Sequence, residues 1–277
     1  MSLINCHSEF AALKSVILCQ PTNMAIKDAI NDIQAHYEQE NIDKELALVE
    51  HRQLTKVLED HEITVKFIPA DKKCPEQVFT RDIGFVIEET LYVGNLKREI
   101  RKRESECLIN FLREEKLPYT KVEIGTIEGG DVIVHNNQVF IGDSSRTAKA
   151  TVDALAKSHP EHTFHLINFD DRFLHLDCVF NPISENEALI YPKAISAESL
   201  DVLNKQFDLI EVTTREQFTL AVNVLSIGQK KVIALPKNRE TNDKLRQRGY
   251  DIIEVDFSEI IKSGGSFRCV TLPIKRI

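Results

Sequence analysis

The chain has 277 residues, of which 42% are hydrophobic and 28% are charged, so it can form a globular core and disorder is not expected. Its net charge of −8 at pH 7 comes from well-mixed acidic and basic residues, which argues against nucleic acid or an anionic membrane surface as a partner. No apolar run approaches the roughly 20 residues that span a bilayer, and the N-terminus lacks a secretory signal pattern.

In chain order, the first predicted elements are a strand within residues 13–21, a helical stretch that extends to about residue 60, and a strand within residues 63–70. Four hairpins follow, each made of two short apolar runs around a polar turn, as in VIVHNNQVFIGD. They occupy residues 82–95, 128–143, 177–192 and 223–236. A helix-like stretch and one more strand follow each hairpin, and the second of these helices is expected to begin at the N-cap signal Ser144-Ser145.

The units open on polar residues at regular intervals. The openings lie 49, 46, 46 and 46 residues apart and are Asp82, Asp131, Asp177, Asn223 and Cys269. The last unit contains only its first strand, and the N-terminal elements supply the rest. We therefore expect residues 16–19 to pair beside residues 269–273 and close a ring. The sequence predicts an α/β fold of five strand–strand–helix–strand units with pseudo-five-fold symmetry, formed by one domain over residues 1–277.

A closed ring brings the opening residues together around its axis, so three carboxylates, an amide and a thiol are expected at one level. Polar residues in such a place indicate function, because burying a charge is costly. Asp131 and Asn223 are interpreted first as caps of strand entries and turns. His175 precedes Asp177 by two residues, so in an extended chain both face one pocket, whereas Cys178 points to the opposite face, into the core.

Cys269 follows Gly264-Gly265, a flexible lead-in that lets the backbone approach a ligand. A thiol, a histidine and several carboxylates around one pocket suit a cationic electrophile. The carboxylates bind the cation, the cation lowers the pKa of the thiol, and the histidine moves protons while the thiolate attacks. A planar guanidinium, whose N–H donors point outward, matches several carboxylates.

The other cysteines and the clustered histidines bear on compartment and metals. The six cysteines are scattered without a Cys-x-x-Cys pair, which favours a reduced, cytoplasmic protein. His159, His162 and His165 are the closely spaced candidates for a metal site. They surround a proline and a glutamate between a helix-like and a strand-like stretch, and we expect a solvated loop there and no metal.

Four motifs together resemble the guanidine-modifying (pentein) superfamily, which includes arginine deiminases, dimethylarginine dimethylaminohydrolases, agmatine deiminases and amidinotransferases. They are FTRD at 79–82, EGGD at 128–131, HLD at 175–177 and GGSFRCVTLPI at 264–274. The resemblance covers nearly the whole chain and implies a five-bladed α/β propeller, which agrees with the repeat. It also implies that the chemistry needs neither a metal nor an organic cofactor.

The resemblance assigns roles to individual residues. Cys269 corresponds to the nucleophile, His175 to the general acid/base and Glu128 to the carboxylate that orients the histidine. Asp82 and Asp177 correspond to the clamps that hold the guanidinium.

The sequence thus favours a hydrolase that converts arginine, or an Nω-substituted arginine, into citrulline and ammonia or an alkylamine through a covalent cysteine intermediate. Arg146 and Arg101 resemble arginines that bind the substrate's α-carboxylate, although a solvated helix start is an equal interpretation of Arg101. The compact length is similar to that of the dimethylarginine hydrolases, whereas HLD and RCVTLPI are more similar to arginine deiminases. Asp177 favours a free terminal N–H, because a dimethylated nitrogen would leave that carboxylate unpaired.

Two alternatives stay open: an amidinotransferase that uses the same Cys-His-Glu site, and a non-catalytic binding protein of the same fold, as in ribosome anti-association factors. The expected partner is a small guanidino compound, with no nucleic acid and no membrane, and the sequence leaves a homo-oligomer open. On composition alone, residues 68–80 are a candidate lid.

Overall fold

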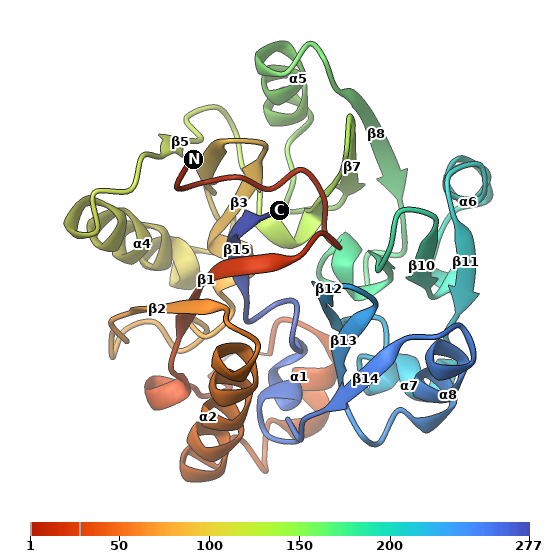
Figure 1. Ribbon diagram of the computed structural model, residues 1–277. Coiled ribbons are helices and arrows are strands. Elements are labelled where there is room, and N and C mark those ends of the chain that lie inside the picture. Colours follow the sequence, from red (N-terminus) through yellow and green to blue (C-terminus); the bar gives the residue numbers. More distant parts are fainter. Residues whose placement is uncertain (1, 28) are drawn as a thin grey trace.

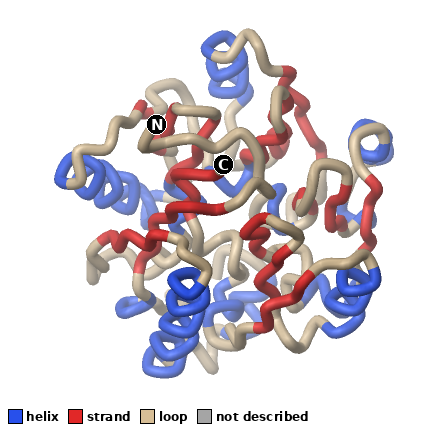
Figure 2. The backbone as a smooth tube through the Cα atoms, in the orientation of Figure 1, coloured by secondary structure: helices blue, strands red, loops and turns tan. Residues whose placement is uncertain are grey.

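Five three-stranded sheets surround a common centre in the computed structural model, which describes residues 2–27 and 29–277 (Figure 1). The strands face the middle of the ring and the helices lie mainly around its outside (Figure 2). Each sheet contains an antiparallel pair, which is a hairpin in four of the five sheets, and one strand that runs parallel to the second strand of that pair. The five-fold α/β propeller expected from the repeat is therefore confirmed.

Four of the five blades follow the predicted hairpin–helix–strand order. The first comprises β3 (Gly84–Ile87), β4 (Thr90–Val93), η2 (Glu99–Arg101), α4 (Lys102–Glu114) and β5 (Thr120–Lys121). The second comprises β6 (Val132–His135), β7 (Gln138–Asp143), α5 (Lys149–Ser158) and β8 (Thr163–Asn168). The third comprises β9 (Phe180–Pro182), β10 (Glu187–Ile190), η5 (Pro192–Ala194), α6 (Ala197–Asn204) and β11 (Asp208–Glu211). After α7 (Thr214–Phe218), the fourth comprises β12 (Leu225–Gly228), β13 (Lys231–Ala234), α8 (Arg239–Gln247) and β14 (Asp251–Glu254).

The fifth blade joins the two ends of the sequence. Its strands are β15 (Leu272–Arg276), β1 (Leu13–Cys19) and β2 (Thr64–Ile68), in that order. β1 is antiparallel to β15, with Val16 opposite Pro273 and Ile17 opposite Leu272, and it is parallel to β2. The pairing of these two segments, expected from the incomplete fifth unit, is present.

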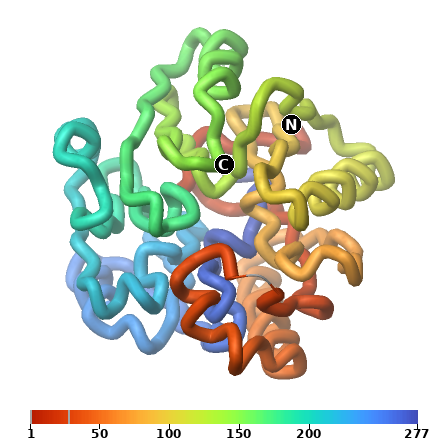
Figure 3. Tube along the Cα trace, turned by 180° about the vertical axis from the view of Figure 1, so that it is seen from behind, coloured from red at the N-terminus to blue at the C-terminus, as the bar shows by residue number. Residues whose placement is uncertain are grey.

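The long helical stretch expected before residue 60 is divided into η1 (Pro21–Asn23), α1 (Asp32–Tyr37) and α2 (Lys44–Asp60). Side-chain caps start the two α-helices, because Asn31 accepts from the backbone N–H of Gln34 and Asp43 accepts from those of Glu45 and Leu46. Seen from behind, the segment with α1 lies against the C-terminal part of the chain (Figure 3), where Asn31 Nδ2 donates to the carbonyl of Ser263 at 3.2 Å.

Two sequence expectations about element starts are wrong. The opening residues lie one to three residues before their strands, and Asp82, Asp131 and Asp177 belong to the short helices α3 (Thr80–Ile83), η3 (Gly129–Asp131) and η4 (Leu176–Cys178). Ser144 does not cap α5, which begins five residues later after Ala148. The Ser144 hydroxyl instead donates to Asp131 Oδ2 at 2.5 Å, so it connects its own blade to the centre.

The centre of the ring is polar and charged. Glu9, from the N-terminal segment, is buried there between Arg81 and Arg268, each of which donates to it at 2.7 Å. Although burial raises it, the two arginines hold the pKa of Glu9 well below its usual range. In the described part of the chain, no helix is both long enough and apolar enough to cross a membrane.

Candidate active site

Five of the seven predicted site residues meet at one end of the ring. Asp82, Glu128, His175, Asp177 and Cys269 are all buried, and they come from the turns that precede strands of four different blades. Three of them, Asp82, His175 and Cys269, line a narrow space of about 10 Å³, roughly room for a single water molecule. A substrate therefore needs the surrounding side chains to move apart before it can bind.

His175 is held between two carboxylates. Its Nε2 lies 2.7 Å from Glu128 Oε2, and its Nδ1 lies 3.5 Å from Asp82 Oδ1. Although burial lowers it, the charges of Asp82 and Glu128 raise the pKa of His175 to about 10. Burial raises the pKa of Glu128, but the hydrogen bond and charge of His175, together with the charges of Arg101 and Arg146, outweigh burial and lower that pKa to about 2. At neutral pH the pair is an imidazolium beside a carboxylate.

The two glycines of EGGD allow this close packing. A Cβ on Gly130 would lie 2.7 Å from Cγ of His175, where a methyl group does not fit. A Cβ on Gly129 would lie 2.2 Å from the carbonyl oxygen of Arg81, which belongs to the neighbouring blade. The motif therefore combines a carboxylate with the backbone that brings it against the histidine.

Cys269 lies beside Asp177, with its Sγ 3.8 Å from each carboxylate oxygen. A hydrogen bond with Cys178, burial and the charge of Asp177 together raise the pKa of the Cys269 thiol well above its usual range. Asn223 fixes the backbone here: its Oδ1 accepts from the N–H groups of Cys269 and Ser266, both at 3.1 Å, and its Nδ2 donates to the carbonyl of Asp177. These partners lie 43 and 46 residues away in the sequence, so Asn223 joins the turns of other blades and does not act as the local cap that was expected.

Each predicted clamp already has an arginine on one side. Asp82 Oδ2 accepts from Arg101 Nη1 at 2.7 Å, and Asp177 Oδ2 lies 3.4 Å from Arg268 Nε. The second oxygen of Asp82, Oδ1, is buried and forms no regular hydrogen bond with the described residues, since Nδ1 of His175 stands 3.5 Å away from it. A buried carboxylate oxygen without a regular hydrogen bond is uncommon and is the atom that a bound N–H group would satisfy.

The two remaining predicted residues differ in their surroundings. Arg101 lines the narrow space and is also bonded to Glu104, with Nη2 2.8 Å from Oε2. Arg146 is buried with its Nε 3.5 Å from Glu128 Oε2, and it is not among the residues that line the narrow space. Both arginines therefore contact carboxylates of the site.

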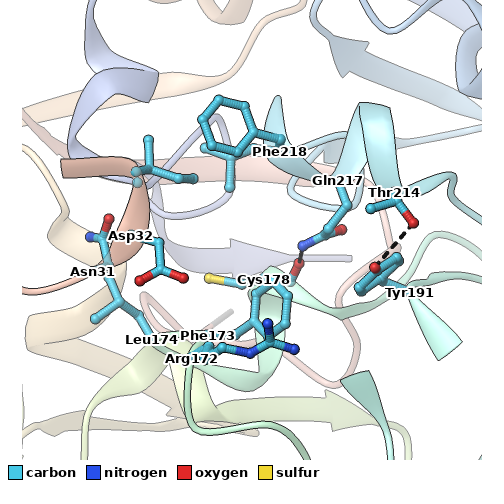
Figure 4. Close-up of a pocket in the computed structure, with 13 residues that line it drawn as sticks. Asn31, Asp32, Arg172, Phe173, Leu174, Cys178, Tyr191, Thr214, Gln217 and Phe218 are labelled. Atoms are coloured by element: carbon cyan, nitrogen blue, oxygen red, sulfur yellow. Dashed lines mark hydrogen bonds between the residues drawn. The ribbon is translucent and has the colours of Figure 1, made fainter. Parts of the chain in front are cut away.

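A larger cavity of about 200 Å³ adjoins the narrow space (Figure 4). The two share three residues in their walls, namely Leu174, Cys178 and Gly264. Aromatic side chains form much of the cavity's wall, from Phe173, Tyr191 and Phe218. None of the seven predicted site residues lines this cavity.

Similar proteins identify the family of this chain. The model of the family described as N,N dimethylarginine dimethylhydrolase, eukaryotic, matches residues 20–276. The chain belongs to this family. It is 48% identical over 271 residues to "Uncharacterized protein YkgA" of Bacillus subtilis (strain 168), covering 98% of this chain and 95% of that protein. It is 28% identical to an arginine deiminase of Listeria welshimeri, covering 73% of this chain and 62% of the deiminase.

Solved structures confirm the fold of this dimethylhydrolase-family chain. The N-terminal domain of the cyanobacterial arginine dihydrolase ArgZ superposes with a TM-score of 0.86 at 22% identity, covering 95% of this chain and 97% of that one. The amidinotransferase SxtG of Microseira wollei superposes with a TM-score of 0.85 at 18% identity, covering 99% and 97%. The membership of the chain in the pentein superfamily, expected from its four motifs, is thus confirmed.

Sequence reasoning missed several residues of this family member's site. Cys178 was expected in the core facing away from Asp177, but it lines both spaces, and its sulfur lies within 4.8 Å of a ligand atom of Cys269 and of Asp177. The alternation rule failed because residues 176–178 form a 3-10 turn rather than a strand. These three side chains could also hold a soft metal ion, in competition with the chemistry of the thiol.

Glu76 and Glu104 were also missed. Glu76 lines the narrow space, and burial raises its pKa to about 8. Glu104, in the first turn of α4, follows Arg101 at the end of η2 by three residues, a spacing that could have indicated their pairing. The candidate lid, residues 68–80, contributes Glu76 and Phe79 to the wall of the site, and its residues 74–80 are all buried.

Proposed function

We propose that the chain is a cysteine-dependent hydrolase of the guanidino carbon of arginine or an Nω-substituted arginine, with Cys269 as nucleophile, His175 as general acid/base and Glu128 as its orienting carboxylate. Among its relatives are arginine deiminases and a dihydrolase, which supports a guanidino C–N bond as the target.

One observation carries the proposal. The buried Asp82 Oδ1 forms no regular hydrogen bond with the described residues and lies 3.5 Å from the ring of His175, in the space that Cys269 also lines. A guanidinium N–H supplies a donor to this oxygen, and its positive charge offsets the cost of two buried carboxylates. Arg101 and Arg268 each offset part of this cost from one side, and the guanidinium adds to them in the space between the carboxylates.

The resting protonation states suggest that substrate triggers the first step. With the thiol pKa raised and His175 protonated, the free enzyme holds a neutral thiol beside an imidazolium. A bound guanidinium lowers the thiol pKa, and the proton leaves to solvent. The thiolate then attacks the guanidino carbon and forms a C–S bond. His175 gives its proton to the departing nitrogen as the C–N bond breaks and ammonia or an alkylamine leaves.

The second half reverses the role of the histidine. The covalent amidino-thioether is a cation, so it stays between Asp82 and Asp177. Neutral His175 takes a proton from water, and the oxygen attacks the same carbon. The C–S bond breaks, the excess proton of the ureido product returns to the sulfur, and the enzyme is again a neutral thiol beside an imidazolium.

The clamp on the Cys269 side favours a particular substrate. Asp177 offers a second carboxylate to the guanidinium terminus, and a dimethylated nitrogen has no N–H to give it. We therefore favour arginine, or a derivative that keeps a free terminal N–H. Arg101 and Arg146 are proposed to act toward the substrate's α-carboxylate, which requires Arg101 to keep part of its guanidinium free of Asp82 and Glu104.

Amidino transfer is a second candidate function, and the adjoining cavity favours it. This cavity shares Cys178 and Leu174 with the wall of the narrow space and is large enough for a small amine. An amine bound there could replace water in the second half-reaction. The same covalent intermediate serves both outcomes.

The test is turnover of arginine, monomethylarginine, asymmetric dimethylarginine and agmatine, each with and without a small primary amine, assayed for ureido and N-amidino products. Cys269→Ser is expected to abolish turnover. Cys107→Ser, which alters a cysteine outside the site, is the matched control and is expected to retain it.

Ureido product from arginine that is lost only in Cys269→Ser supports the hydrolase. Amidino product that grows with amine concentration supports transfer instead. The absence of any product, together with no labelling of Cys269 by a thiol-directed guanidine analogue, would contradict both and leave a binding protein.

A further inference from the structure

A second cluster of ligand-type side chains lies outside the active site, between the first and second blades. It consists of Glu88 in the β3–β4 turn and of His159, Glu161 and His162 in the loop from α5 to β8. One ligand atom of each residue lies within 4.8 Å of those of the others. Two imidazoles and two carboxylates are the donor set of a divalent transition-metal site.

The two histidine rings are not solvated, contrary to the expectation for this loop. The side chain of His159 is 8% exposed and that of His162 is 1% exposed. The third histidine, His165, is separate: its Nε2 bonds Gln138 Oε1 at 2.9 Å and its ring stacks on Phe140. The cluster therefore contains two of the three histidines that the sequence brought together, with Glu88 added by the fold.

His159 is oriented as a ligand. Its Nε2 lies 2.8 Å from the hydroxyl oxygen of Tyr92, which can accept the ring N–H. The other nitrogen, Nδ1, then carries the lone pair and lies 3.4 Å from Glu161 Oε1. A hydrogen bond to the far nitrogen of the ring is the usual support of a metal-binding histidine.

His162 provides the independent observation. Its Nδ1 lies 3.1 Å from Glu161 Oε1, so a proton on Nδ1 leaves the lone pair on Nε2. That Nε2 is buried, has no hydrogen-bond partner among the described residues and lies 3.6 Å from Glu88 Oε1. A buried ring nitrogen without a partner costs free energy, and it faces the other ligands.

Two of the separations match a tetrahedral ion, and the others lie within 4.8 Å. Ligand atoms at about 2.0–2.2 Å from zinc stand roughly 3.3–3.6 Å from one another. The pairs His159 Nδ1–Glu161 Oε1 and His162 Nε2–Glu88 Oε1 lie at 3.4 and 3.6 Å. We propose that Glu88, His159, Glu161 and His162 bind one divalent ion of the zinc class, which clips the β3–β4 turn of one blade to the α5–β8 loop of the next.

None of the four ligands lines the narrow space that holds Cys269 and His175. The role assigned to the ion is therefore structural. Zinc bound here is expected to raise the melting temperature by binding only the folded chain. The thiols of Cys178 and Cys269 form a second place where zinc could bind, so the experiment must separate the two.

The test uses the full chain after treatment with a chelator. Cobalt(II), a spectroscopic substitute for zinc, is expected to bind with one equivalent, to give the visible bands of a tetrahedral ion and to give no sulfur-to-cobalt charge-transfer band. The bands are expected to persist in a Cys178→Ser/Cys269→Ser variant. Calorimetric titration with zinc is expected to show at least a tenfold weaker affinity for Glu88→Gln and for His162→Asn, with Glu123→Gln, an exposed carboxylate elsewhere, unchanged.

Glu88→Gln keeps the proposal testable if His162→Asn fails to fold, because the Glu88 side chain is 37% exposed. Two results together would support the clip: zinc raises the melting temperature of the parent protein, and Glu88→Gln loses both zinc binding and this rise. Metal binding that requires the two cysteines, or no binding by any variant below millimolar zinc, would overturn it.

Discussion

At the scale of single residues, the buried acids near the site differ in protonation because their neighbours differ. Glu128 beside His175 has a pKa lowered to about 2, so it is charged at neutral pH. Burial raises the pKa of Glu104 to about 7, and burial raises that of Glu76 to about 8, with Gln34 as its hydrogen-bond partner. Glu76 is therefore protonated at neutral pH and able to donate a hydrogen bond inside the site.

A Glu76→Gln substitution tests this protonation state. In the unfolded chain Glu76 ionises near its usual pKa of 4.5, whereas in the folded chain it keeps its proton up to about pH 8. Folding is therefore progressively penalised as pH rises from 4.5 to 8, by at most about 1.4 kcal/mol per pH unit, and the penalty is constant above pH 8. Glutamine resembles the protonated acid and does not ionise. The free energy of unfolding of Glu76→Gln should therefore increase relative to that of the parent as pH rises from 4.5 to 8.

The measurement is denaturant unfolding of both proteins at pH 5, 6.5 and 8. The exposed Glu123→Gln variant is the control and should follow the parent at every pH. Stability curves of Glu76→Gln and parent that stay parallel between pH 5 and 8 would mean that Glu76 is already ionised in the folded protein.

At the scale of elements, the site depends on how closely η3 approaches η4. Gly130→Ala places a methyl group 2.7 Å from the ring of His175, so the ring must shift while the backbone stays in place. Misplacing a catalytic group by about 1 Å can cost on the order of 10²-fold in rate. We expect kcat to fall by about that factor while the melting temperature changes little. Gly129→Ala is the contrasting variant, since its methyl group meets the carbonyls of Arg81 and Gly84 and should destabilise the fold.

Turnover and thermal unfolding of both variants distinguish the two effects. Equal losses of stability in Gly129→Ala and Gly130→Ala, or full activity in Gly130→Ala, would contradict the assignment of Gly130 to the packing of His175.

The regular elements were predictable because hydrophobic alternation and spacing are local. The hairpins and the parallel strand of every blade lie where the repeat indicated, and so does the pairing of β1 with β15. The third strand of the first blade is only two residues long, Thr120–Lys121, although the corresponding edge strands of the other sheets have four to six residues.

The contacts between elements were less predictable because they depend on turns. The 3-10 conformation of η4 rotates Cys178 toward Cys269, and alternation assigned it to the core. The hydroxyl of Ser144 was interpreted as a helix cap, but it bonds the buried Asp131, an acid 13 residues away. Asp82 is paired with Arg101 and Asp177 with Arg268 because the closed ring brings these residues together, and no local sequence pattern predicts either pair.

At the scale of the whole molecule, the ring has a charged centre that no single blade completes. Glu9 from the N-terminal segment holds Arg81 of the first blade and Arg268 of the fifth, and Arg268 in turn lies 3.4 Å from Asp177 of the third. Removing one member of such a buried set leaves the others uncompensated, at a cost of several kcal/mol. The ion pairs at the centre and the pairing of β1 with β15 thus both hold the ring closed.

We therefore propose that residues 1–277 unfold as one cooperative domain, and an Ile17→Ala substitution tests it. Ile17 is fully buried in β1, the middle strand of the closing sheet. Loss of its side chain should reduce the free energy of unfolding by about 2–5 kcal/mol.

In a cooperative ring this loss reaches every blade, so calorimetry should show a single transition at lower temperature. The slowest-exchanging amides of β7, across the ring, should lose the same free energy of protection as those of β1. Ile124→Ala, at an exposed isoleucine, is the matched control and should change neither quantity. Two calorimetric transitions, or unchanged protection in β7, would show that the blades unfold separately.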